Sequence, residues 1–128
     1  MTRRWPPENS VTDQRTIEHW QTEAVRIERE HGFADNPGSF GDRMALLHSE
    51  VSEAFEAWRK HGLTDLTAEH DSNGIRPGKP EGVGSEFADI AIRLLTECAR
   101  YGIDLRAEVE RKMAYNERRP FLHGGKSL

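Results

Sequence analysis

Apolar residues recur every three to four positions in four stretches of the chain, which is the spacing of one face of an α-helix. They predict helices over roughly 13–31, 41–61, 85–101 and 105–118. A glycine follows each of the first three, and Pro120 follows the fourth; both residue types are helix stop signals. No segment reads convincingly as a strand, so the predicted fold class is all-α.

The width of the apolar stripe differs between these helices. The stripe of the third helix is wide, so we expect that helix to be central in the fold and nearly all buried. Its narrow polar sector holds Glu86 and Asp89, and Arg93 and Glu97 continue it. The apolar residues of the third helix are Phe87, Ile90, Ala91, Leu94, Leu95, Cys98 and Tyr101.

Helix starts carry side chains suited to capping. Thr12 or Ser10 is expected to cap the first helix, and Asp104 the fourth. Ser39 followed by Asp42 resembles a capping box at the start of the second helix.

The remaining segments are polar or rich in glycine and proline. Residues 1–11 are expected to form an arm without periodicity, and 120–128 an irregular tail. Residues 62–84 hold five glycines and two prolines and are expected to form a long loop, either a lid over a bound ligand or a disordered connection. With 128 residues and no repeat, the chain is predicted to be one domain, 1–128.

Composition narrows the class of protein. The formal net charge of -4 argues against a polymeric nucleic acid as partner, although basic residues gather near the C-terminus. No run of 18 apolar residues exists and the first residues lack a hydrophobic signal region, so no membrane association is expected. A single cysteine, Cys98, excludes a disulfide scaffold and fits a cytoplasmic protein.

Two acidic pairs stand out because they border apolar stripes. Glu50 and Glu53 lie three residues apart on the second helix, and Glu86 and Asp89 lie three apart on the third. Residues at this spacing share one helix face. If the two helices pack together, four carboxylates converge on one pocket. The alternative is that both pairs are ordinary solvated surface.

Converging carboxylates need compensation, because two like charges about 5 Å apart repel by about 3 kcal/mol at an effective dielectric constant near 20. They would either take up protons or bind a cation. Ligation by oxygen alone favours Mg²⁺, with Mn²⁺ as a possible substitute, or Ca²⁺, over zinc. Because Mg²⁺ commonly bridges to substrate phosphates, the acidic pairs indicate phosphate chemistry.

The fourth helix carries a complementary polar face. Lys112, Asn116 and Arg119 stand at positions i, i+4 and i+7, and such a face could grip a polyphosphate. The alternative is that these cations only complement the helix dipole. Trp58 and Phe40 are candidates for stacking on a nucleobase, although aromatic residues on helix stripes are usually core residues.

Taken together, the two acidic pairs, their order, and the segment GIDLRAEVERKMAYNERRP resemble the MazG-like all-α NTP pyrophosphohydrolases. Relatives of that family include the dimeric dUTPases and the phosphoribosyl-ATP pyrophosphohydrolase. The resemblance covers roughly residues 40–120. It implies a four-to-five-helix bundle that assembles as a homodimer or homotetramer.

For the site, the resemblance implies that Glu50, Glu53, Glu86 and Asp89 bind Mg²⁺ and take part in catalysis. It implies hydrolysis of a (d)NTP to a monophosphate and pyrophosphate in nucleotide-pool house-cleaning, with Lys112, Asn116 and Arg119 on the phosphates. Many members carry a further acid immediately before the first motif glutamate, where this chain has Ser49. The water-activating base is then expected to be Glu53 or Glu50.

Two alternatives to a house-cleaning enzyme remain at this stage. A phosphoribosyl-ATP pyrophosphohydrolase would share the chemistry and differ in substrate. A non-catalytic helical interaction module would keep its acids for solubility, and would show neither Mg²⁺-dependent stabilisation nor nucleotide binding.

Overall fold

A computed structural model describes residues 16–32, 36–63, 68–69 and 78–121. Within these ranges the chain is mostly helical, as predicted, and no helix there is long and apolar enough to cross a membrane. The helices are α1 (Ile17–Glu30), α2 (Phe40–His61), α3 (Val83–Arg100) and α4 (Leu105–Glu117).

The helix starts follow from local hydrogen bonds. The backbone N–H of His19 donates to the Thr16 hydroxyl at 3.1 Å, which makes Thr16 the cap of α1. The candidates Ser10 and Thr12 lie outside the described residues. Ser39 and Asp42 form the predicted capping box, in which each side chain accepts from the backbone of the other. Asp104 caps α4, also as predicted.

Two short strands correct the expectation of a strandless chain. β1 (Ala68–Glu69) pairs antiparallel with β2 (Pro80–Glu81), so both sides of the predicted loop 62–84 meet just before α3. Strands of two residues are too short to show an alternating pattern in the sequence. Residues 64–67 and 70–77 lie outside the described ranges, so the choice between a lid and a disordered connection stays open.

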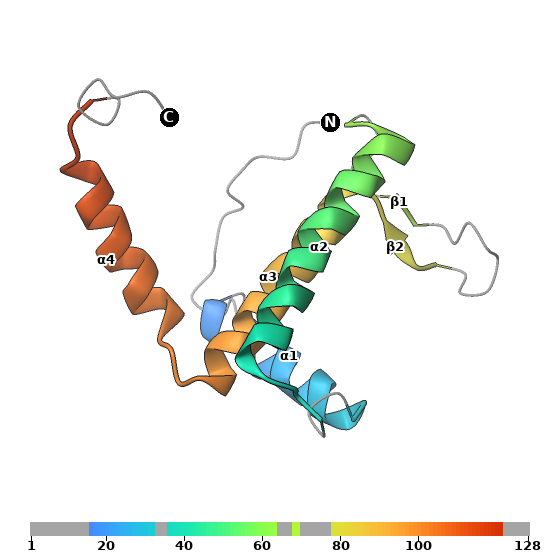
Figure 1. The fold of residues 1–128 in the computed structure, drawn as a ribbon, viewed down its shortest axis with the longest axis horizontal. Helices are drawn as coiled ribbons and strands as arrows, with labels where there is room; N and C mark the ends of the chain where they lie inside the picture. The colour runs from blue at the N-terminus through green and yellow to red at the C-terminus, as the bar shows by residue number, and fades with distance from the viewer. Residues whose placement is uncertain (1–15, 33–35, 64–67, 70–77, 122–128) are drawn as a thin grey trace.

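Helix α3 is the element against which both α1 and α2 pack, and in this sense it is central, as predicted. Figure 1 shows α2 running beside α3, while α4 projects away from the other helices beyond the turn at Gly102. Gly102 has a φ of 67°, a left-handed conformation that favours glycine and lets the chain change direction there.

Two arginine–glutamate pairs fix the register between α2 and α3. The Arg43 Nε of α2 donates to Glu97 Oε1 of α3 at 2.7 Å, and both side chains are buried. Farther along, Arg93 of α3 donates to Glu50 of α2. From the first pair to the second, the residue number rises in α2 and falls in α3, so the two helices are antiparallel.

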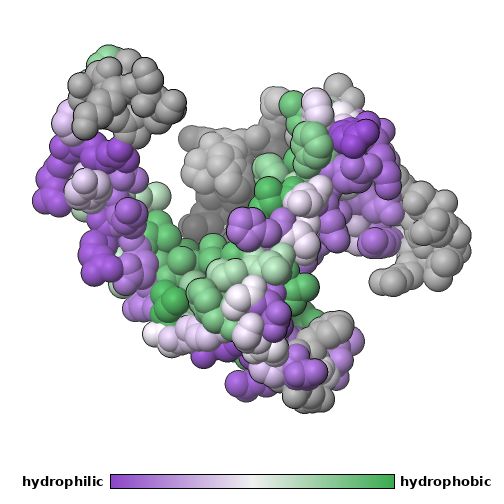
Figure 2. All heavy atoms as spheres, viewed as in Figure 1, coloured by the Kyte–Doolittle hydropathy of each residue, from purple (hydrophilic) through white to green (hydrophobic). Residues whose placement is uncertain are grey.

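The expected burial of α3 is wrong for the chain taken alone. Its C-terminal half is buried around Leu95 and Cys98, but Phe87 is 60% exposed and Ile92 is 48% exposed. The physical reason is that α4 projects outward and leaves part of α3 uncovered. Glu97, expected on the polar sector, is only 3% exposed because it receives Arg43. Figure 2 shows hydrophobic residues gathered on the helical body facing the largely hydrophilic α4.

We predict that the buried Arg43–Glu97 pair is essential for stability. Glu97→Leu leaves the Arg43 charge buried without its partner, and we expect a loss of about 3–5 kcal/mol in the free energy of unfolding, measured with urea. The double variant Arg43→Met with Glu97→Leu should recover most of it. Glu18→Gln, which breaks the exposed pair with Arg106, is the control and should change little. A Glu97→Leu protein as stable as wild type would contradict this role.

Candidate metal centre and adjoining cavity

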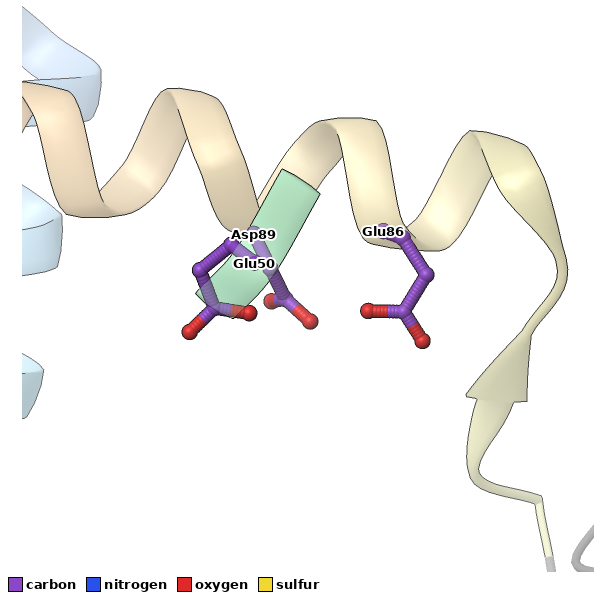
Figure 3. Close-up of side chains that lie close together, drawn as sticks. All are labelled: Glu50, Glu86 and Asp89. Atoms are coloured by element: carbon purple, nitrogen blue, oxygen red, sulfur yellow. The ribbon is translucent and has the colours of Figure 1, made fainter. Parts of the chain in front are cut away.

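Three of the four predicted acids converge. Glu50 projects from α2, and Glu86 and Asp89 project from the first turns of α3. One carboxylate oxygen from each lies within 4.8 Å of the others. Figure 3 shows Glu50 beside Asp89, with Glu86 about one turn away and all three carboxyl groups directed to the same side. We call these three residues the acidic group.

The fourth acid, Glu53, lies at the margin of this arrangement. Its side chain is exposed, and it is not one of the three residues whose oxygens approach within 4.8 Å. It is nevertheless close enough to Glu86 for its charge to act on that carboxyl. Glu53 is therefore next to the acidic group without being part of it.

The electrostatics show that the three carboxyls share one environment. Burial, followed by the negative charges of Asp89 and Glu53, raises the pKa of Glu86 above its ordinary value of 4.5. Burial and the neighbouring Glu50 raise the pKa of Asp89, although Arg93 and Lys79 oppose this shift. Both shifts mean that the folded chain resists full ionisation of the group.

Two cations partly balance this charge. Arg93 donates to the Glu50 Oε1 from Nε at 3.0 Å and from Nη2 at 2.9 Å. Lys79, which precedes β2, acts on Asp89 through its charge alone. Arg93 is thus the direct partner of the acidic group in α3.

The chemistry of the group fits a divalent cation. All its ligand atoms are carboxylate oxygens, which hard ions such as Mg²⁺ and Mn²⁺ prefer. The Glu86 Oε2 atom is buried and has no hydrogen-bond partner among the described residues. A buried carboxylate oxygen left without a donor is costly, and a cation beside it would remove that cost.

A cavity of about 500 Å³ opens beside the acidic group, between α1, α2 and α3. Its lining includes Glu50 and Asp89 of the acidic group together with Arg93. Ile27 and Ile92 contribute apolar surface. The cavity volume lies in the range of small-molecule sites, and the lining is rich in charged side chains.

The predicted phosphate-binding residues are not brought to this site within one chain. Lys112, Asn116 and Arg119 follow the turn after α3, and α4 projects away from α2 and α3. The twelve residue steps from Asp89 to Tyr101 already span about 18 Å along the axis of α3. Lys112 lies 5.8 Å from the centre of the Tyr115 ring, on its own helix.

The predicted base-stacking residues each contact another aromatic ring. Phe40 packs edge-on against Tyr101, with ring centres 5.2 Å apart, and Trp58 lies 5.6 Å from the Phe55 ring. Neither Phe40 nor Trp58 lines the cavity beside the acidic group.

Sequence reasoning gave no role to Arg93 or Lys79. For Arg93, the sequence does contain a signal: it stands four residues after Asp89, on the same helix face, where it can offset acidic charge. Lys79 carries no such signal, because it lies outside the helices and their periodic pattern.

A scan against protein-family models finds no match, and searches of curated proteins and of solved structures find none either.

We predict that the acidic group makes the cation-free protein less stable as the pH rises. A carboxyl with a raised pKa keeps its proton in the folded chain at pH values where the unfolded chain has lost it. The free energy of unfolding therefore falls from about pH 4.5 upward, through the raised pKa of Glu86.

Glu86→Gln removes this contribution. In EDTA, its stability relative to wild type should increase between pH 4.5 and 8, as measured by urea unfolding at each pH. Taking the difference between the two proteins cancels the titration of the groups that do not interact with Glu86. A difference that stays constant with pH would contradict the shared environment of the three carboxyls.

Proposed function

We propose that the protein is a Mg²⁺-dependent nucleoside triphosphate pyrophosphohydrolase that converts a (d)NTP and water to the monophosphate and pyrophosphate. The observation that carries this proposal is the convergence of Glu50, Glu86 and Asp89 from two helices, with a buried Glu86 oxygen lacking a donor. The sequence resemblance to the MazG-like enzymes supports the same conclusion.

Glu50, Glu86 and Asp89 would hold the cation. When bound, it would supply positive charge that lets a triphosphate approach and would lower the pKa of a bound water. Because the group and a triphosphate are both anionic, neither can approach the other without such charge. The cavity beside the group offers space for the rest of the nucleotide.

Glu53 is the best candidate for the base that takes the proton of the attacking water. It is exposed and lies beside Glu86, and unlike Glu50 it is not one of the three proposed cation ligands. Ser49, which stands where many MazG-like proteins have an acid, donates its hydroxyl to the Leu46 carbonyl at 2.6 Å. That hydroxyl is occupied by the helix backbone.

The phosphate contacts of Lys112, Asn116 and Arg119 would come from a second copy of the chain. Within one chain, α4 projects away from the acidic group (Figure 1). A second copy placed against α2 and α3 could bring its own α4 to the acids. The proposed enzyme is therefore a homodimer or a homotetramer.

Exposed apolar side chains support this assembly. Val51, Phe55 and Trp58 follow one face of α2 at i, i+4 and i+7, and are 54%, 59% and 47% exposed. Phe87 on α3 is 60% exposed. No large side chain of the described residues is fully buried, so α1–α3 gain much of their missing core if a second copy covers these residues.

We predict that Glu53→Gln loses at least about 100-fold in kcat, because a general base typically contributes that much or more. The measurement is pyrophosphate release from a panel of canonical, deoxy and damaged nucleotides, and phosphoribosyl-ATP, with Mg²⁺ or Mn²⁺. The panel separates the house-cleaning activity from that of a phosphoribosyl-ATP pyrophosphohydrolase.

The matched control is Glu56→Gln on the same helix, since Glu56 is exposed and pairs only weakly with Arg59, at 3.6 Å. It should retain wild-type activity. A Glu53→Gln protein as fast as wild type would reject Glu53 as the base. A wild-type protein with neither turnover nor Mg²⁺-dependent stabilisation would favour the interaction module instead.

We also predict that the wild-type chain sediments as a dimer or tetramer, and that Phe55→Glu shifts it towards monomer by placing a charge on the apolar face of α2. Analytical ultracentrifugation measures both. The control is Leu63→Glu, which changes another exposed apolar residue just beyond α2. A wild-type protein that stays monomeric at high micromolar concentration would contradict the assembly.

A further inference from the structure

We propose that Arg93 is an exchangeable counterion: it holds Glu50 while the acidic group has no divalent cation, and it releases Glu50 when such a cation binds. The inference rests on the proposed metal centre and deepens it. Arg93 would thus offset part of the negative charge of the acidic group until a cation takes its place at Glu50.

The contact geometry indicates a bond that can be exchanged. Both donors of Arg93 use the same oxygen, Glu50 Oε1, at 3.0 and 2.9 Å. In the pair between Arg106 and Glu18, by contrast, Nε and Nη2 each use a different oxygen, at 2.5 and 2.9 Å. The two-oxygen arrangement is the geometrically specific one. Arg93 lacks that fork and leaves Glu50 Oε2 outside the pair.

The charge balance favours exchange. Three carboxylates approach one another in the acidic group, and among the described residues Arg93 is the only cationic side chain seen to donate a hydrogen bond to any of them. One hydrogen-bonded cation, with Lys79 acting only through its charge on Asp89, does not balance three carboxylates. A divalent cation coordinated by all three compensates more charge than a guanidinium that contacts one.

There is also room for the released side chain. Arg93 lines the cavity of about 500 Å³ beside the acidic group, and its side chain is 27% exposed. It can therefore turn away from Glu50 without displacing closely packed neighbours. Arg43, which also pairs with a glutamate across α2 and α3, has a side chain only 8% exposed. Both arginines line the cavity, so the difference between the two cross-helix pairs is the greater exposure of Arg93.

The competing explanation is that Arg93 stays bonded to Glu50 throughout, and it predicts the opposite effect of removing Arg93 on cation affinity. If Arg93 only orients Glu50 for a cation, removing Arg93 loosens the ligand and weakens cation binding. If Arg93 competes for Glu50, removing it strengthens cation binding.

The test is the affinity for Mn²⁺ alone, measured by titration calorimetry on the full chain without nucleotide. We expect Arg93→Gln to bind Mn²⁺ about tenfold more tightly than wild type, equivalent to about 1.4 kcal/mol. Arg93→Lys keeps the charge without the guanidinium and should fall between the two. The control Arg106→Gln removes the same charge from an exposed pair between α1 and α4 and should bind as wild type does.

A second readout uses the wild-type protein and so does not depend on a variant's folding. The Arg93 Nε–H signal in an NMR spectrum should shift on addition of Mg²⁺, and its hydrogen exchange with water should become faster. Equal or weaker Mn²⁺ binding by folded Arg93→Gln, or an Arg93 Nε–H unchanged by saturating Mg²⁺, would overturn the exchange while leaving the metal centre in place. Failure of the wild type to bind Mn²⁺ would overturn both.

Discussion

The antiparallel packing of α2 on α3 is the constraint on which the rest of the structure depends. The buried Arg43–Glu97 pair joins the two helices at one end of their contact, and Arg93–Glu50 joins them farther along. Because a helix is rigid and turns by a fixed angle per residue, these contacts set which side chains of α2 face those of α3. They place Glu50 against Asp89, and a shift of one residue would rotate Glu50 away by about 100°.

This register brings carboxylates of α2 and α3 close together, and their mutual repulsion opposes the packing of the two helices. Two carboxylates 4.8 Å apart repel by about 3–4 kcal/mol at an effective dielectric constant near 20. The fold meets this cost with Arg93 on Glu50 and with raised pKa values at Glu86 and Asp89. The carboxylates repel one another when no metal ion is bound, and a bound metal ion would remove that repulsion. This suits a site that must receive both a metal ion and a polyanionic substrate.

Most of the fold could be predicted from the sequence, because periodicity and caps are local. The starts of α2 and α4 are each marked by a side chain that bonds to the backbone three residues away, as Ser39 does with Asp42 and Asp104 with Ala107. The convergence of Glu50, Glu86 and Asp89 could be expected too, since the apolar stripes beside them must face each other.

The features that could not be predicted depend on contacts between residues far apart along the chain. The burial of Glu97 requires Arg43, which lies 54 residues away, and a charged residue on a polar sector normally predicts exposure. The uncovered part of α3 depends on the direction of α4 after Gly102, which periodicity does not encode. For the same reason, the sequence placed Lys112 and Asn116 beside the acids, whereas in one chain they lie on the projecting α4.

The central claim is that the three carboxylates of α2 and α3 form one cation site. Paramagnetic broadening of backbone amide signals by substoichiometric Mn²⁺ tests it most directly, because the effect falls steeply with distance from the ion. The account predicts broadening centred on Glu50, Glu86 and Asp89, with the signals of the exposed pair Glu18–Arg106 unaffected. Broadening centred on another acidic surface, or spread evenly over exposed carboxylates, would contradict it.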